Sequence, residues 1–153
     1  MTDVVDPATR SRMMAAIRGK DTSPERQVRR FLHRAGFRFV LNSGLPGRPD
    51  LVLPRYGAAI LVHGCFWHRH AGCAYATTPR NRADFWRQKF RKNEERDALV
   101  LRQLLQDGWR VFVVWECGLR HEADDVLERL ATLLKVPECV KYELPELPPR
   151  GVD

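Results

Sequence analysis

The sequence predicts an α/β protein in which a mixed β-sheet is flanked by helices, and three observations support this. Two short apolar runs, DLVLP and AAILVH, are separated only by RYG and predict an antiparallel hairpin. A nearly continuous apolar run, WRVFVVWE, is typical of a strand buried on both faces. Amphipathic segments with helical periodicity precede, separate and follow these runs.

The elements of the first half are expected in the order helix, helix, strand and hairpin. A first helix over residues 6–19 begins at an Asp-Pro pair, which suits the cap and the first turn. A second over residues 22–36 begins with Thr-Ser-Pro-Glu, a capping box, and places apolar residues at i, i+3, i+4 and i+7. Apolar residues alternate over 37–41 and predict a strand with one buried face. The hairpin follows over residues 50–63.

The second half is expected to contain a long helix, the buried strand and a last helix. The long helix spans about residues 83–106, and the last, amphipathic helix spans 122–134. Residues 136–153 are Pro-rich and acidic, which indicates a loose tail. We therefore expect one domain over residues 1–135 and a C-terminal tail over residues 136–153.

Charge is distributed unevenly along the 153 residues. Residues 1–116 hold 21 Lys and Arg against 11 Asp and Glu, a net of +10, whereas residues 117–153 hold 5 against 8, a net of −3. A concentrated basic surface favours a polyanionic partner such as nucleic acid. No apolar run approaches the ~20 residues of a membrane helix, and the N-terminus has no signal-like apolar region, so we expect a cytoplasmic protein without a membrane partner.

The segment HGCFWHRHAGC, residues 63–73, combines metal-ligand residues with large aromatics. Cys65, His70 and Cys73 are close enough for one loop to present them to a zinc ion. Cys117, directly after the buried strand, is the candidate fourth ligand, and Cys139 is expected to be unliganded. The alternative is that these cysteines pack as small apolar groups.

A second group of residues suits hydrolysis assisted by Mg²⁺. Asp50 begins one hairpin strand and His63 ends the other, so they can lie close together, with His68 just beyond. One carboxylate, a backbone carbonyl and waters form a Mg²⁺ site, and a nearby histidine can take a proton from water. A turn aspartate is the alternative for Asp50. For Glu25, in the second helix, the capping box is a complete structural explanation.

One face of the long helix is suited to contact a nucleic acid. Trp86, Lys89 and Asn93 lie at i, i+3 and i+7 and present an aromatic ring, a cation and an amide together. On the basic first helix, Met14 could press into the minor groove, although methionine on a helix more often serves packing.

Together these motifs resemble one family, the very-short-patch mismatch repair (Vsr) endonucleases. The resemblance covers residues 2–134 and is carried by DPATRSRMMAAIRGKDTSPE, LPGRPDLVLP, HGCFWHRH, FWRQKFRKNEERD and GWRVFVVWEC. It implies a restriction-endonuclease-like fold and strand-specific nicking of double-stranded DNA beside a T·G mismatch, the lesion left when 5-methylcytosine is deaminated. On this interpretation we expect the protein to be a monomer and to associate with the nucleoid.

The resemblance also implies roles for individual residues. Asp50 resembles the family's metal-binding aspartate, and Val62 offers Mg²⁺ a backbone carbonyl where the family has a threonine. His68 resembles the general base, supported by His63 and Glu25. The four residues matching the structural Zn²⁺ ligands are Cys65, His70, Cys73 and Cys117. The three aromatics matching those that wedge into the DNA stack are Phe66, Trp67 and Trp86.

Wedging unstacks a base step at a cost of a few kcal/mol, which is lower where pairing is already faulty. A zinc-fixed loop that displays Phe66 and Trp67 would therefore favour a mismatch over intact duplex; the alternative is that both are core aromatics. Two other functions remain open: a non-catalytic, zinc-stapled DNA-binding module, and a restriction-type endonuclease that cuts both strands.

Overall fold

A computed structural model describes residues 22–146 of the chain. The predicted first helix over residues 6–19, and Met14 with it, lies outside the described residues. Among residues 22–146, none of the helices has both the length and the apolar character that crossing a membrane requires.

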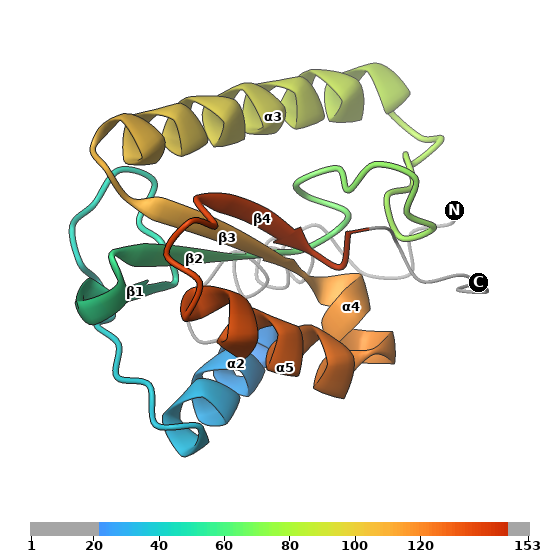
Figure 1. The fold of residues 1–153 in the computed structure, drawn as a ribbon. Coiled ribbons are helices and arrows are strands. Elements are labelled where there is room, and N and C mark those ends of the chain that lie inside the picture. The colour runs from blue at the N-terminus through green and yellow to red at the C-terminus, as the bar shows by residue number, and fades with distance from the viewer. Residues whose placement is uncertain (1–21, 147–153) are drawn as a thin grey trace.

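The centre of the fold is a four-stranded mixed sheet in the order β1-β2-β3-β4 (Figure 1). β1 (Leu51–Leu53) and β2 (Ala58–His63) are antiparallel, which confirms the predicted hairpin. β3 (Arg110–Trp115) runs parallel to β2 and is buried at every residue, as its apolar sequence predicts. β4 (Lys141–Leu144) runs parallel to β3 on its other side.

β4 was not predicted, because it lies within residues 136–153, which we interpreted as a tail. Its sequence, KYEL, has little apolar content, and only Leu144 of the strand is fully buried. The segment leading to β4 is held by the buried Arg110, whose guanidinium donates to the Cys139 carbonyl at 2.8 Å and the Val136 carbonyl at 2.6 Å. Residues 141–144 therefore belong to the sheet and not to a loose tail.

The strand predicted over residues 37–41 is also wrong. Phe37 is buried, but its N–H donates to the Leu32 carbonyl and so closes the preceding helix. Only Val40 forms a β-bridge, with Val52, and it stays 46% exposed. The apolar alternation here reflects a chain that leaves the helix and touches the sheet edge at a single residue.

The helices form a layer on each side of the sheet (Figure 1). α3 (Ala83–Gln106) covers one face, as predicted in extent. α2 (Ser23–Arg34) and α5 (Ala123–Leu134) cover the other. The predicted last helix is preceded by a separate short one, α4 (Glu116–His121), which begins directly after β3.

The cap of α2 forms as predicted, since the Glu25 N–H donates to the Thr22 hydroxyl oxygen at 3.4 Å. The buried side chains Val28 and Leu32 pack this helix against the core. The first turn of α2, with Glu25, lies near Asp50, at the end of the hairpin where β1 begins and β2 ends.

Candidate functional site

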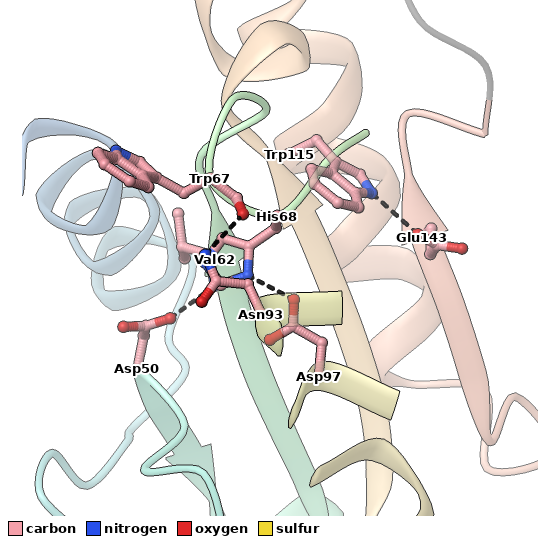
Figure 2. A network of polar contacts seen from close by, with 8 residues as sticks. All are labelled: Asp50, Val62, Trp67, His68, Asn93, Asp97, Trp115 and Glu143. Carbon is pink, nitrogen blue, oxygen red and sulfur yellow. Dashed lines mark hydrogen bonds and ion pairs between the residues drawn. The ribbon is translucent and has the colours of Figure 1, made fainter. Parts of the chain in front are cut away.

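Asp50 stands immediately before β1 and faces the end of β2 across the hairpin. Its Oδ2 accepts a hydrogen bond from the Val62 N–H at 2.6 Å (Figure 2). In an extended strand the N–H and C=O of one residue point to the same side, so the Val62 carbonyl is also directed towards Asp50. The predicted meeting of Asp50 with the end of β2 is therefore present in the structure.

Burial dominates the electrostatics of Asp50, and a second carboxylate lies nearby. Burial raises the pKa of Asp50 to about 7; the Val62 N–H bond opposes this increase, and the charge of Glu25 on α2 adds to it. Arg29, one turn further along α2, lowers the pKa in turn. Two carboxylates and a carbonyl thus converge at one place, where a cation would relieve their mutual repulsion.

The two predicted histidines lie face to face. The rings of His63 and His68 stack with centroids 3.8 Å apart and planes 5° apart. His63 is 9% exposed, and burial, with the proximity of His68, lowers its pKa to about 3. His63 is therefore an uncharged imidazole at neutral pH.

His68 also meets a carboxylate that the sequence did not point to. Its Nδ1 lies 2.7 Å from Oδ2 of Asp97 on α3, with both side chains about 30% exposed (Figure 2). A proton on Nδ1 that is donated to Asp97 leaves the lone pair of Nε2 free in the neutral ring. One signal was present in the sequence: Trp86, Phe90, Asn93 and Asp97 share one helix face by their spacing.

The predicted DNA-contacting aromatics form one cluster beside this site. The Phe66 ring lies 5.1 Å from Trp67, 5.7 Å from Trp86 and 5.1 Å from Phe90, centroid to centroid, each edge to face. Phe90 is buried, whereas Phe66, Trp67 and Trp86 stay partly exposed. These three rings are neither core aromatics nor fully displayed ones, because they pack together and also reach the surface.

The loop that carries these aromatics is tied down by polar contacts. The Asn93 amide donates to the Trp67 carbonyl at 3.2 Å (Figure 2). Arg69 donates to the carbonyls of Phe66, at 3.3 Å, and Ala76, at 3.0 Å, and its guanidinium carbon lies 3.9 Å from the centre of the Phe90 ring. The loop conformation is therefore fixed by α3 and by the loop itself.

A cluster of three cysteines and one histidine lies behind the loop, and the ligand atoms of Cys65, His70, Cys73 and Cys117 all lie within 4.8 Å of one another. The His70 Nδ1 is 3.7 Å from the Cys65 sulfur and 3.3 Å from the Cys117 sulfur. Tetrahedral zinc with the usual bond lengths separates sulfur and nitrogen ligands by roughly 3.6 Å. The donor set and its spacing therefore fit zinc, and Cys139 does not belong to the cluster.

The cluster is arranged to hold a thiolate. Hydrogen bonds from the Cys117 thiol, and also from His70 and the Cys117 N–H, lower the pKa of Cys65 to about 4, although its burial acts in the opposite direction. The Cys117 N–H lies 3.4 Å from the Cys65 sulfur. A thiolate is the form in which cysteine binds a metal.

Comparison with known proteins places the chain in a family. A family model described as "DNA mismatch endonuclease Vsr" matches residues 2–74. The chain is 40% identical over 153 residues to the DNA mismatch endonuclease Vsr of Escherichia coli (strain K12), covering 99% of this chain and 97% of that protein. This chain belongs to the Vsr family. It is likewise 45% identical over 120 residues to the Type II nicking enzyme V.XorIIP of Xanthomonas oryzae pv. oryzae, covering 78% of this chain and 88% of that protein.

Membership of the Vsr family identifies the chain as a DNA mismatch endonuclease with DNA as its substrate. A nuclease of this kind implies a divalent metal, and the cluster of three cysteines and a histidine could bind a metal as well. The structure brings each predicted group together: Asp50 with Val62 and Glu25, the two histidines with each other, and the aromatics of the loop with Trp86. Asp97 is the site residue that sequence analysis missed.

Proposed function

We propose that this Vsr-family endonuclease nicks one strand of duplex DNA beside a T·G mismatch, with Mg²⁺ as its catalytic metal and Zn²⁺ as a structural one. The observation that carries the proposal is that two parts meet at the end of β2: Asp50 bonds to Val62, and His68, which is paired with Asp97, stacks on the next residue, His63 (Figure 2). Five relatives are named Type II nicking enzymes, which supports a break in one strand over cleavage of both.

The residues that would hold Mg²⁺ are Asp50, through its carboxylate, and Val62, through its carbonyl, with Glu25 nearby. These are oxygen donors, which Mg²⁺ prefers and which it supplements with water. When bound, the metal would polarise the scissile phosphate and make bound water easier to deprotonate. His63, His68 and Asp97 could also hold a metal, but imidazole ligands suit other metals, and the His68 Nδ1 is already paired with Asp97.

Three residues of the chain would take part in proton transfer from the attacking water, each with a different role. His68, with Nε2 free, accepts a proton from the attacking water as general base. Asp97 fixes the ring by its short contact to Nδ1 and stabilises the imidazolium that forms. His63 stacks on His68 and limits its movement, and it adds no charge because its own pKa is low.

The remaining residues would recognise the substrate. Phe66, Trp67 and Trp86 form a cluster that is ordered before binding, so it can enter a base step without first losing conformational freedom. A step containing a mismatch opens at lower cost than a paired one. Lys89 would hold the DNA strand and Asn93, on the same face of α3, would hold the loop. Met14 would contact the minor groove.

The rest of the fold supports this assignment. A mixed sheet with Asp50 at the open end of its hairpin and Glu25 of α2 beside it is consistent with a restriction-endonuclease-like fold. Zn²⁺ held by Cys65, His70, Cys73 and Cys117 would cross-link the aromatic loop to the end of β3, because Cys117 lies directly after that strand.

Nicking of duplexes by an Asp50→Asn variant tests the proposal. Each strand of a T·G duplex and of a T·A duplex carries its own label, and cleavage is followed with and without Mg²⁺. We expect wild-type protein to cut one strand of the T·G duplex only, and Asp50→Asn to bind it but not to cut it. Asp107→Asn, an exposed aspartate at the far end of α3, is the matched control and should cut normally.

Each other outcome contradicts a stated part of the proposal. Wild-type rates in Asp50→Asn would remove Asp50 from the metal site. Cleavage of both strands of the T·A duplex would favour a restriction-type enzyme. Binding of DNA without any cleavage by wild-type protein in Mg²⁺ would favour the non-catalytic, zinc-stapled module.

A further inference from the structure

The outward face of α2 carries a row of basic side chains that the proposed chemistry does not use. Their spacing of i, i+3, i+4, i+7 and i+8 puts them on one face of the helix. This basic stripe consists of Arg26, Arg29, Arg30, His33 and Arg34, which together line one hollow of the surface. The stripe lies opposite Val28 and Leu32, the side chains that pack α2 into the core.

Nothing in the described part of the chain neutralises most of this charge. Among residues 22–146, no carboxylate forms an ion pair with Arg26, Arg30 or Arg34. Elsewhere in the same range, exposed arginines do pair, as Arg120 does with Glu116 and Arg129 with Glu146. Like charges four residues apart destabilise a helix, so the stripe does not serve the stability of α2. It is a surface suited to an anionic partner.

The position of the stripe next to the active site indicates that its anionic partner is DNA. Glu25, the residue before Arg26, faces Asp50, so the stripe starts at the active site. Arg29 also acts on Asp50, whose pKa it lowers. From Arg26 to Arg34 the helix rises roughly 12 Å, and phosphates of one DNA strand recur every ~3.4 Å along the duplex axis. The stripe is thus long enough to face about three consecutive phosphates.

We propose that the basic stripe of α2 binds the phosphate backbone of the substrate duplex beside the nicked position. The proposal rests on DNA being the substrate, and it extends the interface from the aromatic cluster across the active site to α2. Its contacts would be electrostatic and independent of sequence, so the stripe would add affinity for any duplex and no preference for the mismatch.

The salt dependence of binding tests this assignment. Binding of the Arg30→Gln/Arg34→Gln variant to T·G and T·A duplexes is measured without divalent metal over a series of salt concentrations. The plot of log K against log salt has a negative slope, and each lost phosphate contact makes this slope less steep by about 0.9. The slope of the double variant should therefore be less steep than that of wild type by roughly 1.8. Affinity for the two duplexes should fall by the same factor.

Two controls separate the stripe from charge in general. Arg55 is exposed in the turn between β1 and β2, at the end of the hairpin away from Asp50, so Arg55→Gln should keep the wild-type slope. Arg30→Lys/Arg34→Lys keeps both charges and should also keep the slope. Unchanged melting temperatures would show that these surface substitutions leave the fold intact.

A wild-type slope in the double glutamine variant would overturn the proposal and leave the stripe to an acidic protein partner. An equal loss of slope in Arg55→Gln would overturn it too, because any surface charge would then act alike. Neither result depends on cleavage, so loss of this proposal is distinguishable from failure of the proposed nicking reaction.

Discussion

Replacing Cys117 by alanine should destabilise the protein far more than replacing Cys139 by alanine. The Cys117 sulfur is fully buried and lies 3.3 Å from the His70 nitrogen, inside the cluster that fits zinc. Cys139 is only partly buried, at the edge of the core, and lies outside that cluster. Both substitutions remove one sulfur atom, so the change of volume is matched, and the effect of a chelator separates the metal site from the difference in burial.

The size of the difference follows from linkage between zinc binding and folding. Metal that binds only the folded chain stabilises it, and a thousandfold weaker affinity, which we expect for the loss of one thiolate ligand, removes about 4.1 kcal/mol at saturating zinc. For a chain of this size, 1 kcal/mol shifts the melting temperature by about 2–4 °C. Cys117→Ala should therefore melt roughly 8–16 °C lower than wild type. Cys139→Ala, an ordinary substitution near the core worth about 1 kcal/mol, should melt about 2–4 °C lower.

Thermal melts followed by circular dichroism, combined with metal analysis, measure both quantities. Wild type and Cys139→Ala should carry one zinc per chain, and Cys117→Ala should lose its zinc to a moderate chelator. A strong chelator should bring the wild-type melting temperature down towards that of Cys117→Ala. Equal melting temperatures for the two variants, or wild-type protein purified without any zinc, would refute the proposed ligand set.

Two further predictions concern catalysis and recognition. Asp97→Asn removes the charge from a short contact worth about 1.5–3 kcal/mol, so single-turnover nicking should slow by roughly ten- to hundredfold. The affinity of Asp97→Asn for DNA should not change. Asp84→Asn, an exposed aspartate on the same helix, is the control and should nick at the wild-type rate. A wild-type nicking rate in Asp97→Asn would show that Asp97 has no part in the mechanism. Trp67→Ala should lower the preference for T·G over T·A duplexes, since stacking on a base contributes ~1–3 kcal/mol. If both affinities fall by the same factor at one salt concentration, Trp67 is a packing or general contact residue.

The parts of the fold that sequence analysis predicted correctly are those whose burial pattern is local. β3 is apolar from Val111 to Trp115 because both faces are covered, and α2 is marked by its cap and its spacing. β4 could not be recognised in this way, because an edge strand needs few apolar residues. Its place in the sheet depends on β3, including Arg110, which lies far away in the chain. The alternation over residues 37–41 misled for the opposite reason: the pattern was present, but the chain has a pairing partner at one residue only.

In the candidate site, too, sequence analysis found the residues that lie close together in the chain and missed one that only tertiary packing brings in. Cys65, His70 and Cys73 are close in sequence, so their spacing alone indicated a metal. Asp97 lies 29 residues from His68, on a helix rich in charged residues, where one carboxylate among many looks like part of a solvated face. Helical spacing places Asp97, unlike Glu95, on the face of Trp86, but only the packing of α3 against the loop brings Asp97 to His68. The pair with His68 is therefore a property of tertiary structure, which no local pattern encodes.

Packing also explains why metal ligands and reactive histidines share so short a segment. The Trp115 ring stacks on His70 at 4.2 Å between centroids and meets His63 edge to face at 5.2 Å. Its indole N–H donates to Glu143 of β4 at 2.9 Å, which fixes the ring on the sheet (Figure 2). A metal that holds His70 thus holds Trp115, whose edge-to-face contact limits the movement of His63 and of His68 stacked upon it. Because close-packed groups transmit displacement, we expect loss of the metal to disturb the His68–Asp97 pair as well as the aromatic loop.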